Sequence, residues 1–236
     1  MLQVKAIATK IYHPGDDFES FLIENIKAHL KEREILAITS KIVSLSENRI
    51  ILKTNIDKKE LICKEADHYL GEIGYGCHLT IKQGLLIPSS GVDESNAEGD
   101  YYILYPENPF LSVKKIHSLI KKKLGLKKFG ILLTDSHTMP LRRGVLGAAL
   151  AYYGFRGVES KIGTKDLFGA KLKITQINIA DALAASAVHT MGEGKEGYPL
   201  AIIKAKVDFI DLPNNSELQI PLEEDLYRPL LEKSLN

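Results

Sequence analysis

The sequence has no tryptophan, only two cysteines and almost no net charge, and these scarcities narrow what the protein can be. Cys63 and Cys77 form no CxxC pair, which excludes a disulfide framework and a cysteine zinc site and favours a reducing compartment. The formal net charge of +1 provides no bulk field to attract nucleic acid or a membrane surface. No apolar run approaches the roughly 18 residues of a membrane span, and no signal-peptide pattern opens the chain. We therefore expect a cytoplasmic protein that binds neither nucleic acid nor membrane.

Familiar catalytic signatures are missing as well. No G-x-x-x-x-G-K-[ST] occurs, so a P-loop is absent, and the histidines form no HExxH or other close ligand pair. Ser89 and Ser90 do not lie in a G-x-S-x-G elbow, which leaves a serine hydrolase without support. Residues 192–197 do fit G-x-G-x-x-G, but this loop follows an apolar helix and precedes a strand, which is the reverse of a dinucleotide fold. What remains is a backbone-rich loop that could wrap a phosphate, or a plain helix C-cap at Gly192.

The apolar patterns predict an α+β protein. The 236 residues can bury one large core or two small ones, and 44% apolar residues is ordinary for a globular chain. Short apolar runs predict strands at 2–8, 35–39, 78–81, 85–87, 101–105, 131–134, 171–177 and 200–203. Helical spacing predicts helices at 57–72, 110–124 and 179–191, while residues 145–155 fit either state. Because strands and helices alternate irregularly, we expect mixed β-sheets with packed helices rather than a doubly wound sheet.

Residues 129–144 are the stretch with the most chemistry. The apolar run 131–134 ends on Asp135 and Ser136, and Pro140 keeps the following loop from becoming a regular element. Arg142 and Arg143 close that loop. A carboxylate and a hydroxyl at the end of a buried strand, with two guanidinium groups nearby, suit a metal-bound phosphate. An aspartate that caps the next turn and two solvated arginines explain the same residues equally well.

Three acids lie in similar settings, among small residues: Asp93, Asp135 and Glu193. Carboxylate oxygens suit Mg²⁺ or Mn²⁺, which complete their coordination with water and substrate phosphates. Two such ions could hold a triphosphate and offset charge while its terminal phosphoryl group moves. Ser40 and Lys41, at the end of another short strand, could also touch phosphate. The alternative is that the three acids belong to unrelated turns.

Taken together, the segments resemble the coenzyme F-420-0:L-glutamate ligase family, over residues 14 to about 204. The resemblance is carried by Pro14-Gly15-Asp16-Asp17, Ile38-Thr39-Ser40-Lys41-Ile42-Val43-Ser44, Gly91-Val92-Asp93-Glu94-Ser95-Asn96, Thr134-Asp135-Ser136, Arg142-Arg143-Gly144, Lys165-Asp166-Leu167-Phe168-Gly169 and Met191-Gly192-Glu193-Gly194. It implies a γ-glutamyl ligase-like domain at 1–210 with a tail at 211–236, built as an intertwined homodimer. It also implies an enzyme that uses GTP or ATP, with two Mg²⁺ or Mn²⁺ ions, to attach L-glutamate to a deazaflavin precursor through an acyl phosphate. K⁺ is a further candidate cofactor.

The resemblance also implies roles for individual residues. Asp93 and Asp135 would hold one ion, and Ser136 and Glu193 the second. The nucleotide would be contacted by Ile11 at its base and otherwise by Ser40, Lys41, Asn96, Met191, Gly192, Glu193, Gly194, Lys195 and Gly197. Arg142 and Arg143 are the candidates for stabilising phosphoryl transfer.

Two departures from the family pattern concern the acceptor and the phosphate. Many members have a second lysine at the position of Leu45, and Gly-Arg where Thr138-Met139 stands here. Methionine cannot replace an arginine contact to an anionic acceptor. We therefore hypothesise the same chemistry on another acceptor, a dihydrofolate or tetrahydrofolate. The alternatives are F-420-0 itself as acceptor, a nucleotide-binding module without ligase activity, which Leu45 favours, and a two-metal phosphohydrolase.

Overall fold

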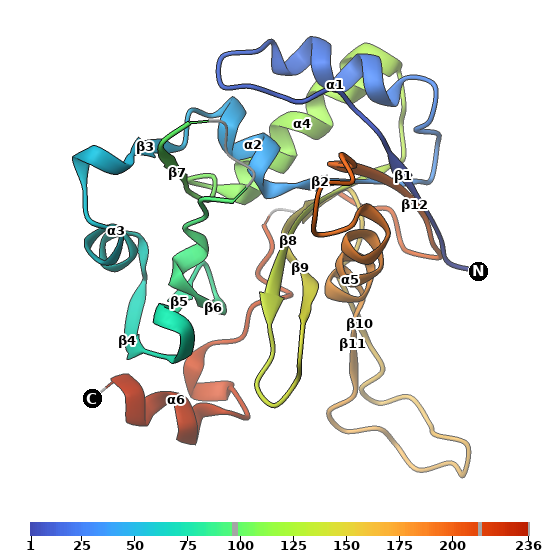
Figure 1. Ribbon diagram of the computed structural model, residues 1–236. Helices are drawn as coiled ribbons and strands as arrows, with labels where there is room; N and C mark the ends of the chain where they lie inside the picture. Colours follow the sequence, from blue (N-terminus) through green and yellow to red (C-terminus); the bar gives the residue numbers. More distant parts are fainter. Residues whose placement is uncertain (96–98, 212–213, 236) are drawn as a thin grey trace.

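A mixed five-stranded sheet forms the centre of the molecule, and the computed structural model describes residues 1–95, 99–211 and 214–235 (Figure 1). Its strands lie in the order β1 (Gln3–Ile7), β12 (Leu200–Lys204), β2 (Ile35–Thr39), β8 (Gly130–Thr138) and β9 (Val145–Tyr153). β2 and β8 are parallel, and the other neighbours are antiparallel. The expected α+β architecture with mixed sheets is confirmed.

Helices cover both faces of this sheet. α1 (Phe18–Ile26) and α4 (Pro109–Leu124) pack on one face, and α5 (Ile179–Met191) packs on the other (Figure 1). Side chains alternate along β8 accordingly: Ile131 and Leu133 join the core under α4, whereas Leu132 joins the core under α5. Side-chain caps begin these helices, with Asn108 accepting from the Leu111 amide at 3.0 Å and Asn178 accepting from the Asp181 amide at 2.9 Å.

A smaller group of elements lies beside the end of β2. It contains α2 (Ser40–Ser46), the pair β3 (Ile50–Leu52) and β7 (Tyr101–Ile103), α3 (Lys58–Glu65), and the sheet of β4 (His68–Glu72), β5 (His78–Lys82) and β6 (Leu85–Pro88). Three 3₁₀ turns connect them: η1 (Lys53–Asn55), η2 (Gly74–Gly76) and η3 (Ser89–Gly91). The helix predicted over 57–72 is wrong in its second half, because Ala66 is extended and β4 pairs with β5. Cross-strand pairing there outweighs the helical spacing.

The β8–β9 hairpin corrects the prediction for residues 135–138. β8 does not end at Thr134 but continues through Thr138, because each residue from Asp135 to Thr138 pairs with one on β9. The undecided stretch after Gly144 is β9, and the turn between the strands covers 139–144. A bulge in β9, where the pairing shifts between Leu133 and Thr134, lies directly before Asp135.

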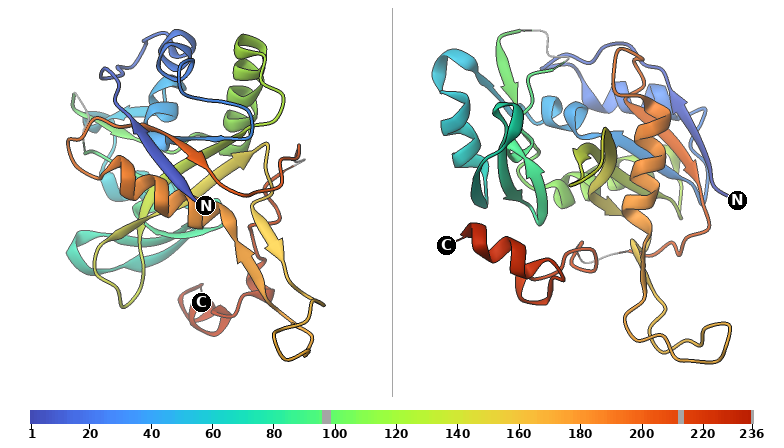
Figure 2. Two further views of the ribbon diagram at one scale, coloured as in Figure 1. Left: turned by 90° about the vertical axis from the view of Figure 1, so that its right-hand side faces the viewer. Right: turned by 60° about the horizontal axis from the view of Figure 1, so that its bottom comes forward.

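A long arm and the C-terminal tail complete the described chain. The arm starts at β10 (Val158–Ser160) and returns at β11 (Gln176–Asn178), and it projects away from the body in Figures 1 and 2. The strand predicted at 171–177 is therefore mostly wrong: its last two residues lie in β11, and Lys171 makes only an isolated bridge. The tail contains η4 (Leu222–Glu224) and α6 (Arg228–Leu235).

The tail contacts the body through Glu217. Its carboxylate accepts from the Gly157 amide at 2.6 Å and from the Tyr152 hydroxyl at 3.0 Å. The division of the chain at residue 210 stays a prediction. In the part of the chain that the structure describes, no helix is both long and apolar enough to cross a membrane.

Candidate functional site

The parallel pairing of β2 and β8 creates the candidate site. The two strands run in register from Ile35 opposite Gly130 to Thr39 opposite Thr134. Directly beyond this pair, β2 passes into α2 at Ser40 and Lys41, while β8 continues into Asp135 and Ser136. Residues that follow parallel strands at their carboxyl ends meet at one sheet edge, which is a common place for ligands.

Asp93 and Lys41 meet at this edge. The backbone of Asp93 pairs with that of Ile103, the last residue of β7, through two hydrogen bonds of 2.9 and 2.8 Å. The Lys41 ammonium lies 2.7 Å from an Asp93 carboxylate oxygen and donates to the Ser95 carbonyl at 2.6 Å. Burial acts to raise the pKa of Asp93, but the hydrogen bond and charge of Lys41 and the bonds from Ser95 lower it below its ordinary value. Asp93 is therefore an ionised partner of Lys41.

Asp135 lies next to this ion pair and is partly buried. It points to the α4 side of the sheet, and the Tyr105 hydroxyl donates a hydrogen bond to its carboxylate. Burial raises the pKa of Asp135 to about 6, the nearby charge of Asp93 adds to this rise, and the bond from Tyr105 opposes it. A cavity of about 20 Å³, with room for about one water molecule, is lined by both aspartates, Lys41 and Ser44. Among the described residues, the buried Ser44 hydroxyl has no hydrogen-bond partner.

Glu193 reaches the same edge from the other side of the sheet. It lies two residues after Met191, the last residue of α5, and the nearby Ser136 hydroxyl, which points opposite to Asp135, favours its ionised form. Burial raises the pKa of Glu193, and so do the negative charges of Glu196 and Asp93, while Lys41 acts in the opposite direction. The structure therefore brings the three predicted acids to the same edge of the sheet.

The other predicted nucleotide residues lie along the same edge. The loop after α5 is tied to the ends of two strands, since the Thr9 amide donates to Gly197 and the Thr39 amide donates to Pro199. Ile11 lies two residues after Thr9 and is 77% exposed. Gly192, Gly194, Lys195 and Gly197 are exposed in the loop, whereas Ser40 and Met191 are buried, so Met191 could offer only its backbone. Asn96 lies outside the described residues.

Arg142 and Arg143 lie farther away, at the exposed tip of the β8–β9 hairpin. Within the described chain, no bond links either side chain to the three acids. The extension of β8 explains this separation, because three strand residues beyond Asp135 span about 10 Å. Their catalytic role stays a prediction. Leu45 also lies away from the acids, buried with Tyr12 and Ile42 in an apolar cluster.

The donors at the site fit a hard divalent cation, since carboxylates and a hydroxyl supply only oxygen. In residues 1–95, 99–211 and 214–235, however, no three Asp, Glu, His or Cys side chains are grouped as a ready cation site. Two of the acids are engaged by other side chains instead: Asp93 forms an ion pair with Lys41, and Asp135 accepts a hydrogen bond from Tyr105. Sequence reasoning missed Tyr105, because no motif or spacing connects it with Asp135.

Comparison with known proteins shows where the chain belongs. The family model described as F420-0:gamma-glutamyl ligase matches residues 6–205. The chain belongs to this family. Membership makes it an enzyme of the amide-forming γ-glutamyl ligase class, as the resemblance predicted.

The curated relatives match this chain over most of its length. The coenzyme F420:L-glutamate ligase of Methanococcus maripaludis strain C7 is 36% identical over 220 residues, which cover 86% of this chain and 88% of the relative. The enzyme of the same name from Methanocaldococcus jannaschii is 36% identical over 211 residues, which cover 88% of this chain and 81% of the relative. That of Methanopyrus kandleri is 31% identical over 209 residues, covering 81% of each chain.

Proposed function

We propose that this family member joins an acceptor carboxylate to the amine of L-glutamate, using GTP or ATP and two Mg²⁺ or Mn²⁺ ions. One observation carries the proposal: Asp93, Asp135 and Glu193, from three distant segments, converge with Lys41 beside the glycine-rich loop. This combination of oxygen donors, an ammonium group and an exposed glycine-rich loop suits a metal-bound triphosphate.

The chemistry explains why a nucleotide is needed. A carboxylate is a poor electrophile and does not condense with an amine unaided. An oxygen of the acceptor carboxylate attacks the γ-phosphorus, the nucleoside diphosphate leaves, and an acyl phosphate forms. The glutamate amine then attacks the carbonyl carbon, inorganic phosphate leaves, and the amine gives up a proton. The products are an amide, a nucleoside diphosphate and phosphate.

Residues of the chain have separate tasks in this scheme. Lys41 and the amides of the 192–197 loop bind the phosphates, and Ser40 supports them at the start of α2. Asp93 and Asp135 would hold one ion, and Ser136 and Glu193 the other; bound there, such ions offset charge on the phosphates. Arg142 and Arg143 are proposed to stabilise the transferring phosphoryl group, and K⁺ is retained as a candidate cofactor.

The acceptor is proposed from the departures in the sequence. The names of the relatives specify L-glutamate and coenzyme F420 as their substrates. We carry L-glutamate over to this chain and propose a dihydrofolate or tetrahydrofolate as acceptor, because Thr138 and Met139 replace the charged pair of many members. F-420-0 is the alternative acceptor.

An acceptor assay tests these proposals together. Purified protein would be incubated with GTP or ATP, Mg²⁺ or Mn²⁺, L-glutamate and either F-420-0 or tetrahydrofolate, with products identified by mass spectrometry. Glutamylated folate supports the folate proposal, and glutamylation of F-420-0 alone rejects it. Phosphate release that does not require glutamate would indicate a phosphohydrolase, and tight nucleotide binding without turnover would indicate a binding module. An Asp135→Asn variant serves as the inactive control.

A homodimer is also proposed, on the basis of the β10–β11 arm. Leu167 and Phe168, near its tip, are 98% and 96% exposed, and Ile174 is also exposed. Such apolar groups on a projecting segment are costly in water and are typical of a segment that packs against another chain. A cytoplasmic location stays a prediction.

A further inference from the structure

Tyr105 stands out among the groups at the site because no predicted role includes it. It is 5% exposed, lies between β7 and α4, and donates its hydroxyl hydrogen to Asp135. A phenol inside a cluster of carboxylates is costly to bury unless its hydrogen has a partner. The bond to Asp135 supplies that partner, and it also selects one orientation of the carboxylate.

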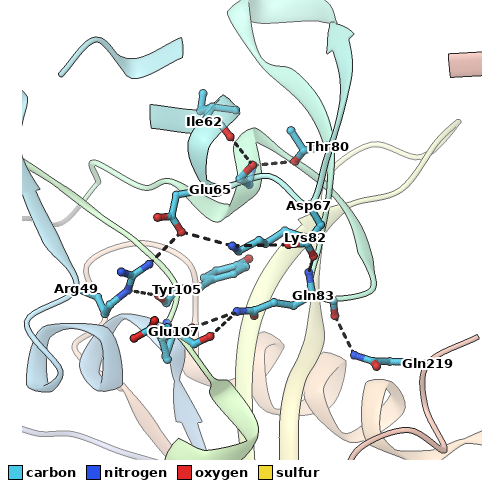
Figure 3. A network of polar contacts seen from close by, with 12 residues as sticks. Arg49, Ile62, Glu65, Asp67, Thr80, Lys82, Gln83, Tyr105, Glu107 and Gln219 are labelled. Carbon is cyan, nitrogen blue, oxygen red and sulfur yellow. Dashed lines mark hydrogen bonds and ion pairs between the residues drawn. The ribbon is translucent and has the colours of Figure 1, made fainter. Parts of the chain in front are cut away.

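The backbone around Tyr105 is anchored from two directions (Figure 3). The Arg49 Nε donates to the Tyr105 carbonyl at 2.9 Å, and an Arg49 Nη donates to Glu65 at 3.0 Å. The Gln83 side chain donates to the Pro106 carbonyl at 3.1 Å. Lys82 lies 3.5 Å from the same Glu65 oxygen, which connects the β5–β6 hairpin to the network. The segment that carries the phenol is therefore held by charged and amide groups that do not themselves line the cavity.

The ring of Tyr105 is constrained as well. Gly91 approaches it so closely that a Cβ at this position would lie 2.2 Å from the ring, and its φ of +68° suits glycine. The preceding residue, Ser90, is held by two hydrogen bonds. Its hydroxyl donates to the Ile62 carbonyl at 3.0 Å, and its amide donates to the Thr80 hydroxyl at 2.9 Å. This fixed turn leads directly to Asp93. The ring therefore touches the segment of one aspartate while the hydroxyl binds the other.

We propose that Tyr105 is a positioning residue for the cation-binding carboxylates: its hydroxyl orients Asp135, and its ring sets the turn that presents Asp93. This inference rests on the proposed metal-dependent function. Outer groups of this kind orient the ligands of a metal, and their loss typically lowers metal affinity about 10- to 100-fold.

Titration of the full-length protein with Mn²⁺ tests this role, with free Mn²⁺ followed by electron paramagnetic resonance. Each titration is run with and without a non-hydrolysable GTP analogue. Tyr105→Phe removes only the hydroxyl and is expected to weaken Mn²⁺ binding about 10- to 100-fold. Tyr102→Phe removes a hydroxyl from another buried tyrosine nearby and is expected to leave the affinity within about twofold. A merely structural effect would lower the unfolding temperature of Tyr105→Phe without changing the Mn²⁺ affinity of the folded protein.

Gln83→Leu provides a second variant if Tyr105→Phe does not fold. It removes the donor to Pro106 and is expected to weaken Mn²⁺ binding about 2- to 10-fold, less than direct loss of the hydroxyl. If wild-type protein binds Mn²⁺ and the variants bind it equally well, the inference is overturned and the proposed function stands. If wild-type protein binds no Mn²⁺ in either condition, the proposed metal site and the inference are both overturned.

Discussion

Lys41 provides the positive charge beside Asp93. Its ammonium group is 2.7 Å from the carboxylate and is only partly exposed. A divalent cation and Lys41 would therefore compete for Asp93, whereas nucleotide phosphates would attract Lys41 away from it. Nucleotide and cation should then strengthen each other's binding, because coupling between two ligands is reciprocal.

Lys41→Gln tests this competition. We expect Mn²⁺ to bind more tightly without nucleotide, by about five- to tenfold, because the competing charge is gone, while GTP binds at least about tenfold more weakly. Titration calorimetry with each ligand alone provides both affinities. Lys64→Gln, which removes a lysine paired with Glu60 on α3, should change neither. Weaker Mn²⁺ binding by Lys41→Gln would contradict the competition.

Asp135→Asn should stabilise the metal-free protein although it removes a proposed ligand. Burial raises the pKa of Asp135 to about 6, above its ordinary value of 3.8, so the folded state binds the proton more tightly than the unfolded state does. Wild-type stability therefore falls as pH rises from about 4 to about 6 and stays lowered above that. The variant should gain about 1–3 kcal/mol in free energy of unfolding at pH 7.5 and almost nothing near pH 4.

Urea unfolding in the presence of EDTA measures this difference at both pH values. Asp208→Asn, at an exposed position, is a matched control and should change the free energy of unfolding by less than about 0.5 kcal/mol. Equal stability of Asp135→Asn and wild-type protein at pH 7.5 would mean that the carboxylate is better solvated than its surroundings indicate.

At the scale of elements, local signals predicted some segments and long-range pairing decided others. α5 has the predicted bounds because Asn178 caps its start and Gly192 follows its end. The predictions of a helix over 57–72 and of a strand end at Thr134 were wrong. β4 pairs with β5 and the end of β8 pairs with β9, and such long-range pairing leaves no local period in the sequence. Candidate acids could be named from the sequence, but their convergence depends on long-range contacts, such as the pairing of β2 with β8 and of Asp93 with Ile103.

The contact of α5 with β9 gives a prediction at this scale. A Cβ at Gly147 would lie 2.3 Å from the Ala184 carbonyl oxygen, a backbone atom that cannot move without displacing α5. Gly147→Ala should therefore lower the free energy of unfolding by about 1–3 kcal/mol, measured by thermal or urea unfolding. Gly74→Ala places the same methyl group in open space, and it should be nearly neutral. A neutral Gly147→Ala would contradict the tight packing of α5 on the sheet.

At the scale of the whole molecule, the β10–β11 arm is the feature that the single chain does not explain. It projects from the body (Figure 2), and its residues Leu167 and Phe168 are almost fully exposed. If the arm packs against a second copy, burial of these two side chains contributes about 3–6 kcal/mol per arm to association.

Leu167→Ser combined with Phe168→Ser should accordingly convert a dimer to a monomer in sedimentation velocity, at concentrations where the wild-type protein remains dimeric. Leu226→Ser, which changes an exposed leucine in the tail, is the matched control and should leave the oligomeric state unchanged. A monomeric wild-type protein, or a double variant that stays dimeric, would show that the arm does not hold two chains together.

The register of Thr39 with Thr134 limits where this chain can gain or lose residues. Deleting one residue inside β8 would reverse every side chain after it, so that a serine would point at Lys41 and an aspartate would point at the α5 side. The arm between β10 and β11 and the hairpin tip at 139–144 carry no such constraint. Variation in length among homologous chains should therefore be concentrated in those two segments, while the spacing from Ile35 to Lys41 and from Gly130 to Ser136 stays invariant.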